Sequence, residues 1–188
     1  MAIEKPKTYC AFVEGLEASN VHKTYHDNQY GFPIDSDNEL FGRLILEINQ
    51  AGLNWTTILK KQAQFKKAYS AFDIKKIATY TEKDRERLLL NPGIIRNKLK
   101  VNAAIFNAQQ IINIQKEFGS FNAWLDKNHP LTLEEWVALL KKTFKFTGGE
   151  ITKEFLISTG YLKGAHEKKC PIYTKVIHKK PIWSTTIH

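Results

Sequence analysis

The chain has 188 residues, of which 43% are hydrophobic and 25% are charged, a composition typical of a globular protein. Its 28 basic and 19 acidic side chains give a net charge of +9, which favours a polyanionic partner, nucleic acid before a membrane surface. A merely basic soluble protein is the alternative, and charge alone does not exclude it. Two cysteines exclude a disulfide scaffold, and without an apolar signal core or a run of about 20 apolar residues we expect a soluble, cytoplasmic protein.

The spacing of apolar residues and helix caps predicts an all-α chain, because no segment alternates as a strand does. We expect a flexible tail at 1–9, a single domain of two helical lobes at 10–175 and a C-terminal tail at 176–188. Residues 25–31 are predicted to be a polar and aromatic loop, and 161–188 to be irregular. The expected helices lie at about 37–51 and 55–70, after Asp73, from Thr81 to Leu90, at about 95–117 with Leu99 among its apolar positions, from Phe121 to His129, after Thr132 and at about 150–159.

A carboxylate stands at the edge of an apolar helix face. The helix predicted at 37–51 opens with a capping box, and Glu47 lies three residues after Leu44 on its apolar wedge. Trp55 follows at the start of the next helix. Burying a charge is costly without a partner, so Glu47 is either a functional carboxylate or an edge residue that reaches water or pairs with Arg43. The pattern alone favours the edge residue.

Two histidines and two cysteines form a candidate metal site. His166 and Cys170 lie four residues apart, a ligand spacing found at zinc sites, and Cys10 with His26 would complete a tetrahedral set. Such a site would join the two ends of the chain. Two unrelated reduced cysteines are the alternative, and the spacing alone leaves that alternative slightly ahead.

A glycine-containing turn between two predicted helices is a candidate anion site. Gly148 and Gly149 give an external anion close access to backbone N–H groups at a helix N-terminus. This arrangement is typical of a helix-hairpin-helix that binds DNA without reading its sequence, and a plain helix-helix turn is equally compatible with it. A second basic turn lies at 91–100. The lysines beside the first turn are Lys141, Lys142 and Lys145.

Aromatic residues interleave with polar ones in the N-terminal third of the chain. Rings usually pack in a core, but their polar neighbours favour a pocket for a nucleic-acid base. The rings concerned are those of Phe12, Tyr25, Tyr30 and Trp55.

Taken together, these features resemble the bacterial 3-methyladenine DNA glycosylase I family of the helix-hairpin-helix superfamily. The resemblance extends from Cys10 to Cys170. The family usually has Glu-Trp at the position of Gln29-Tyr30, and often Trp at the position of Phe12. The matching stretches are Tyr-His-Asp-Asn at 25–28, Glu47 with Gln-Ala-Gly-Leu-x-Trp at 50–55, Leu-Lys-Lys at 59–61, Gly-Ile-Ile-Arg at 93–96, Phe-Lys-Phe-x-Gly at 144–148 and His-x-x-x-Cys at 166–170.

The resemblance implies a helix-hairpin-helix glycosylase fold with a structural zinc that ties the N- and C-terminal segments together. It implies that Glu47 recognises the base, as the catalytic carboxylate, and that Leu53 enters the duplex where the base has left. The implied zinc ligands are Cys10, His26, His166 and Cys170; the base-binding residues are Tyr25, Trp55, Glu47, Phe12 and Tyr30; the DNA-binding hairpin contributes Gly148, Gly149 and Lys145.

The implied reaction is hydrolysis of the N-glycosidic bond of 3-methyladenine after the base has been flipped out of double-stranded DNA. A monofunctional enzyme without lyase activity is expected, because no aspartate follows Asp126, whereas many relatives carry a catalytic aspartate beyond the hairpin. We expect a monomer with zinc as the only cofactor and no membrane partner. The alternative is a zinc-stabilised helical DNA-binding module without catalysis, which would have no need of Glu47 in an apolar pocket.

Overall fold

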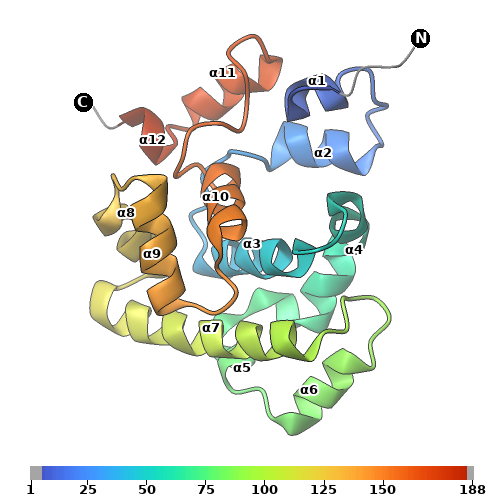
Figure 1. The fold of residues 1–188 in the computed structure, drawn as a ribbon, viewed down its shortest axis with the longest axis vertical. Coiled ribbons are helices and arrows are strands. Elements are labelled where there is room, and N and C mark those ends of the chain that lie inside the picture. Colours follow the sequence, from blue (N-terminus) through green and yellow to red (C-terminus); the bar gives the residue numbers. More distant parts are fainter. Residues whose placement is uncertain (1–5, 186–188) are drawn as a thin grey trace. The chain divides into compact units, whose positions relative to one another are not determined.

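The computed structural model describes residues 6–185, and all regular elements in this range are helical (Figure 1). The chain divides into two compact units. The terminal unit comprises residues 6–33 and 156–185 of the described range, and the central unit comprises residues 34–155. The all-α fold class is therefore confirmed for the described residues.

The terminal unit is built from both ends of the chain. Thr8 accepts a hydrogen bond from the backbone N–H of Ala11 and caps α1, and Asn20 caps α2 in the same way. Pro171 opens α11 at a position where a missing N–H costs nothing. The helices of this unit are α1 (Tyr9–Val13), α2 (Val21–Asn28), α11 (Pro171–His178) and α12 (Ile182–Thr185).

The loop predicted at 25–31 is wrong, because α2 continues to Asn28. Polar side chains support this helix: Lys23 pairs with Asp27 one turn later at 3.0 Å, and Asn28 donates to the carbonyl of Thr24. The chain then turns at Gly31, whose φ of 80° suits a residue without a Cβ.

The segment 161–188 is also more regular than predicted, because α11 and α12 lie within it. Ile172 and Val176, one turn apart, pack with Cys170 in a small hydrophobic cluster. Tyr9 was assigned to the flexible tail, yet it is the first residue of α1. In the C-terminal tail predicted at 176–188, α11 continues to His178 and α12 follows, and only residues 1–5 and 186–188 of the two predicted tails lie outside the described residues.

The central unit contains the helices that the sequence predicts, most of them within one to three residues of the expected ends. The Thr81–Asp84 and Thr132–Glu135 capping boxes are both present. The helices are α3 (Asp37–Gln50), α4 (Trp55–Ala68), the 3-10 helix η1 (Ser70–Phe72), α5 (Ile74–Ala78), α6 (Glu82–Leu89), α7 (Lys98–Phe118), α8 (Phe121–Asn128), α9 (Leu133–Thr143) and the first seven residues of α10 (Gly149–Ser158).

Helix α7 runs along the central unit and contacts α3, α5, α6 and α8 (Figure 1). Its buried stripe includes Val101, Ile105 and Ile111. Leu99, which the sequence placed on the apolar face, is instead 64% exposed, although its neighbours Lys100 and Val101 in the same turn are buried, so Leu99 lies on the outward side of the helix. No helix within residues 6–185 combines the length and apolar character needed to cross a bilayer.

Candidate active site and metal cluster

Cys10, His26, His166 and Cys170 meet in the terminal unit, and their ligand atoms lie within 4.8 Å of one another. Cys10 Sγ lies 3.4 Å from His26 Nε2, and His26 Nε2 lies 3.1 Å from His166 Nδ1. Cys170 Sγ is 3.8 Å from each of these two nitrogens. Ligands of a tetrahedral zinc ion are separated by about 3.3–3.8 Å, given Zn–N and Zn–S bonds of about 2.0 and 2.3 Å. The four residues thus form a group that could hold a metal ion.

The remaining ring nitrogens of the two histidines are both engaged. His26 Nδ1 lies 2.7 Å from Asp27 Oδ1, and His166 Nε2 lies 2.7 Å from the carbonyl oxygen of Tyr30. Both partners are acceptors, so each nitrogen carries the proton, which leaves His26 Nε2 and His166 Nδ1 with free lone pairs. These are the two nitrogens that face the cluster, and such outer partners are what orient histidine ligands at metal sites.

The electrostatics of the cluster suit a cation. Burial lowers the pKa of His166 to about 4, so its ring is neutral at pH 7 and offers a lone pair. Burial raises the pKa of the Cys10 thiol to about 11 when no metal is present. A bound metal reverses that shift, because a thiol deprotonates when it coordinates.

Beside the metal cluster the terminal unit holds a cluster of aromatic rings. Tyr25 and Tyr30 are buried and their ring centroids are 5.6 Å apart, whereas Phe12 is 41% exposed and stacks on Tyr9. Tyr9 lies edge-on to Tyr30 at 5.3 Å, and its hydroxyl lies 3.0 Å from Nδ1 of the buried His22. Tyr9 and His22, which the sequence analysis did not single out, therefore pack with the three predicted base-binding residues of this unit.

Glu47 lies in the central unit on α3 and is only 3% exposed. The interpretation of Glu47 as an edge residue that reaches water is therefore wrong. Arg43, one turn earlier on α3, is also buried, so pairing between the two stays an alternative. Trp55 is the first residue of α4 and is partly exposed.

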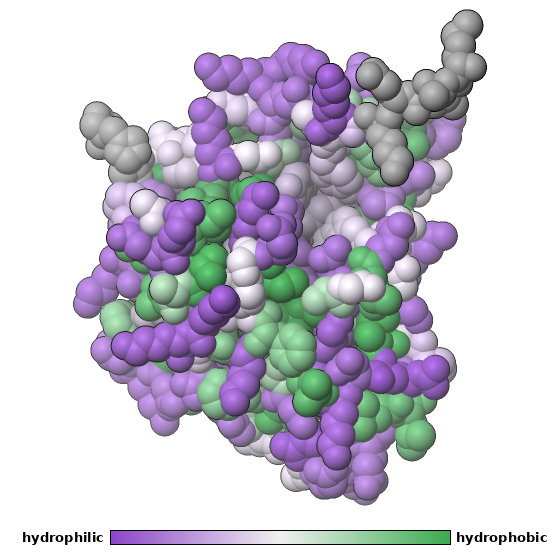
Figure 2. Space-filling model, viewed as in Figure 1, coloured by the Kyte–Doolittle hydropathy of each residue, from purple (hydrophilic) through white to green (hydrophobic). Residues whose placement is uncertain are grey.

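A tight turn joins α3 to α4 and carries an exposed apolar side chain. Gly52, with φ of 79°, reverses the chain, and Asn54 caps α4 through the N–H of Thr56. Between them Leu53 is 40% exposed. Hydrophilic side chains cover much of the face of the molecule that Figure 2 shows, so an exposed leucine is a notable feature. We call residues 50–54 the wedge turn.

The predicted hairpin lies between α9 and α10, in a conformation that buried hydrogen bonds maintain. The Thr147 hydroxyl donates to the carbonyl of Leu140 at 2.8 Å, and that of Thr152 donates to the carbonyl of Thr147. Phe146 adopts a φ of 62°. An added Cβ at Gly148 or Gly149 would meet no atom within 4 Å, so packing inside the protein does not require either glycine. A glycine leaves the backbone open to close approach from outside.

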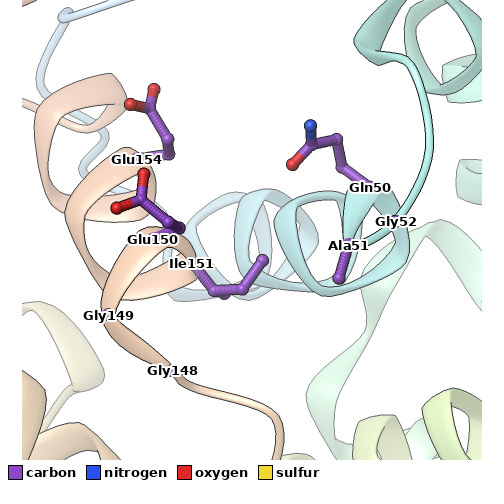
Figure 3. Close-up of a pocket in the computed structure, with 8 residues that line it drawn as sticks. All are labelled: Gln50, Ala51, Gly52, Gly148, Gly149, Glu150, Ile151 and Glu154. Carbon is purple, nitrogen blue, oxygen red and sulfur yellow. The ribbon is translucent and has the colours of Figure 1, made fainter.

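A groove of about 570 Å³ separates the wedge turn from the hairpin. Figure 3 shows Ile151 extending from α10 toward α3, with Glu150 and Glu154 one turn apart on α10. The groove is lined by Gln50, Ala51, Gly52, Gly148, Gly149, Glu150, Ile151 and Glu154.

A sequence model of methyladenine glycosylases matches residues 16–138, well over half of the chain. The chain belongs to the methyladenine glycosylase family. DNA-3-methyladenine glycosylase 1 of Escherichia coli (strain K12) is 34% identical to it, with 79% of this chain and 89% of the relative covered. The family, the enzyme class and the function predicted from the sequence are thereby confirmed: a DNA repair N-glycosylase for 3-methyladenine.

Solved structures agree with this assignment. The 3-methyladenine DNA glycosylase I of Staphylococcus aureus matches with a TM-score of 0.76 and 30% identity, covering 89% of this chain and 97% of the other. A variant of a 3-methyladenine DNA glycosylase I in complex with 3-methyladenine matches with a TM-score of 0.75 and 31% identity, covering 87% and 96%. The all-helical fold is therefore that of the family.

Sequence reasoning missed three residues of the glycosylase's terminal unit: Tyr9, His22 and Asp27. Asp27 could have been found, because it directly follows a proposed ligand and a carboxylate is a common partner of a metal-bound histidine. Tyr9 and His22 gave no such signal, since only the packing of α1 on α2 brings their rings together.

Proposed function

We propose that this glycosylase removes 3-methyladenine from double-stranded DNA by hydrolysis, with Glu47 as the carboxylate that recognises the flipped base. The observation that carries the proposal is the 3% exposure of Glu47, a carboxylate buried on the helix that leads into the wedge turn. A base must leave the stack before its glycosidic bond can be reached. A base-recognising carboxylate on the helix that leads into a turn with an exposed apolar side chain, Leu53, suits this requirement.

The chemistry asked of Glu47 is modest. N3-methylated adenine carries positive charge while it is attached to the sugar, so it is already a good leaving group. An ionised Glu47 would accept hydrogen bonds from the amino edge of the base and favour its charge. The proposed base-binding rings, those of Tyr25, Trp55, Phe12 and Tyr30, would stack on a cationic base. Water then attacks the sugar.

DNA would be held by the wedge turn and the hairpin. Leu53 is an exposed apolar side chain on a short, capped turn, which suits insertion into a duplex. Gly148 and Gly149 would let a phosphate approach the N–H groups at the start of α10, with Lys145 close by. These contacts carry no base specificity, so affinity would depend on salt. The absence of an aspartate after Asp126 supports hydrolysis without lyase activity.

We propose zinc as the metal of the Cys10–His26–His166–Cys170 cluster. Two thiolates and two imidazoles suit zinc, and four protein ligands leave no open position for catalysis. The ion would therefore stabilise the terminal unit by joining residues 10–26 to residues 166–170. A cytoplasmic location and a monomeric state stay predictions.

The experiment that tests this function is incubation of the purified protein with methylated duplex DNA, followed by chromatography of the released bases. Release of free 3-methyladenine, with abasic sites left uncleaved, is the expected result. DNA binding without any base release would instead favour the alternative, a zinc-stabilised binding module.

A further inference from the structure

Helix α7 carries two buried polar side chains that hold the backbone of other segments. Lys100 is 6% exposed, and its Nζ donates to the carbonyl oxygens of Asn49 at 3.0 Å and Ala51 at 2.8 Å. These carbonyls lie at the C-terminus of α3, where orphan carbonyl groups and the helix dipole both favour a cation. Lys100 thus attaches the start of α7 to the wedge turn.

The second side chain is Asn107, which is fully buried. Its Nδ2 donates to the carbonyl oxygen of Lys145 at 3.1 Å, and its Oδ1 accepts from the backbone N–H of the same residue at 2.8 Å. The amide therefore satisfies both backbone groups of the residue that leads into the hairpin.

Lys100 and Asn107, which we call the two clamps, lie on the same side of helix α7. Seven residues of an α-helix span about 10 Å and return to within about 20° of the same direction. Lys100 holds one wall of the groove in Figure 3, formed by Gln50, Ala51 and Gly52, and Asn107 holds the segment that enters the opposite wall. The separation between the wedge turn and the hairpin is thus set by the length of α7 between its two clamps.

We infer that Lys100 and Asn107 are positioning residues that set the spacing between Leu53 and the Gly148–Gly149 hairpin. The hairpin then binds the DNA backbone at the distance from Leu53 that extrusion of the base requires. This rests on the proposed function. The arrangement bears on rate because a displacement of about 1 Å in a positioning contact can cost a hundredfold. Burial of Lys100 lowers its pKa, a cost that an exposed lysine would not carry.

The test compares duplexes in which 3-methyladenine lies opposite thymine or opposite an abasic site. Extrusion costs less when the base is unpaired, so a defect in extrusion shrinks on the second substrate, whereas a general loss of folded enzyme lowers both rates equally. For Lys100→Met we expect about a thirtyfold loss in single-turnover rate opposite thymine and less than about fivefold opposite the abasic site. Lys100→Arg, which keeps the charge and donors, should recover most of the loss.

Two further variants test the coupling itself. Asn107→Asp keeps the acceptor but removes the Nδ2 donor, and it should show the same substrate-dependent loss. In combination with Leu53→Ala, the Lys100→Met loss should be much less than the product of the single losses, because both act through Leu53. Lys116→Met, at an exposed position of α7, is the matched control and should match the parent.

Three results would each assign the two residues to stability alone and overturn the inference. They are equal losses of single-turnover rate on both duplexes, full additivity of the Lys100→Met and Leu53→Ala rate losses, and melting temperatures too low for assay in every variant of Lys100 and Asn107. Failure of the parent enzyme to excise the base from either duplex would instead contradict the proposed function.

Discussion

At the scale of single residues, the decisive feature is a carboxylate that the fold keeps from water. Glu47 lies on α3 with Arg43 one turn before it, and both are buried. Transfer of a charge out of water is tolerated only when hydrogen bonds or an opposite charge compensate for it. A buried carboxylate is therefore unfavourable for folding stability, but it is well suited to recognise a cationic base.

Glu47→Gln should therefore lower single-turnover excision of 3-methyladenine by about tenfold to about two-hundredfold. Glutamine is nearly isosteric, but it loses the charge and replaces one acceptor by a donor; a charge-assisted hydrogen bond contributes about 1.5–3 kcal/mol, at 1.36 kcal/mol per factor of ten. Melting temperature and affinity for abasic DNA should change little. Glu39→Gln, on the exposed first turn of α3, is the control. Normal excision by Glu47→Gln would leave Glu47 as a partner of Arg43 without a role in recognition.

At the scale of elements, the hairpin separates the requirements of binding from those of folding. Gly149 is the first residue of α10, and a methyl group there would meet no protein atom within 4 Å. Glycine costs about 0.5–1 kcal/mol relative to alanine within a helix. Packing inside the protein does not explain a glycine at position 149, whereas the close approach of a DNA phosphate would.

Gly149→Ala should accordingly change stability and DNA affinity in opposite directions. The melting temperature should rise by about 1–3 °C, since alanine restricts the unfolded chain and has a higher helix propensity than glycine. Affinity for undamaged duplex DNA should fall severalfold because the methyl group obstructs the backbone N–H groups. Thermal melting and a fluorescence titration at fixed salt measure the two effects. Gly119→Ala, at a positive-φ position far along the chain from the hairpin, should lower stability without altering affinity. Unchanged DNA affinity in Gly149→Ala would make the turn a plain connection.

The capping box of α9 yields a prediction about pH. Thr132 accepts from the N–H of Glu135, and the Glu135 carboxylate accepts from the N–H of Thr132, which lowers the pKa of Glu135. A folded-state pKa below that of the unfolded chain contributes stability that is present above the unfolded value and is lost as pH falls through the folded value. Glu135→Gln should thus be less stable than the parent at pH 7, and the difference should be smaller at about pH 3, below the usual glutamate pKa of about 4.3. Urea titrations at both pH values measure it, and a difference that persisted in acid would point to packing in place of charge.

At the scale of the whole molecule, described segments from the N-terminal and C-terminal parts of the chain meet at the metal cluster. Besides the four candidate ligands, the Thr8 hydroxyl donates to Glu167 at 2.7 Å across 159 residues of sequence. A zinc ion here would close a long loop and add its binding free energy to folding.

Purified protein should contain one zinc ion per chain, and chelation should lower the melting temperature by about 10 °C, since a ligand at about a thousand times its Kd adds about 4 kcal/mol. Elemental analysis and melting with and without chelator measure both. Cys170→Ser should lose the metal. Thr8→Val, which removes the Thr8–Glu167 hydrogen bond but no ligand, should retain it. A stable protein free of metal would refute the zinc site.

The sequence alone determined the class and most of the helices, because caps and apolar spacing act within a few residues of each other. The boxes at Thr81 and Thr132 placed two helix starts correctly. Local pattern failed at residues 25–28, where polar residues stay helical, and at Leu99, an apolar residue on the exposed side of α7. The family motifs predicted the four metal-cluster residues and Glu47, although spacing alone favoured the simpler interpretation of each.

Only the tertiary structure could decide between those interpretations, because burial and distance depend on segments that are remote in sequence. It excluded a solvent-exposed Glu47, and it brought Cys10 and Cys170 to the same two histidines. It also revealed the hydrogen bonds of Lys100 and Asn107 to remote backbone. Lys100 reaches Asn49 across 51 positions of sequence and Asn107 reaches Lys145 across 38, so neither pair leaves a local pattern. A helix face can be read from a period of 3.6 residues, but the partner of a buried polar group is determined by the packing of the whole unit.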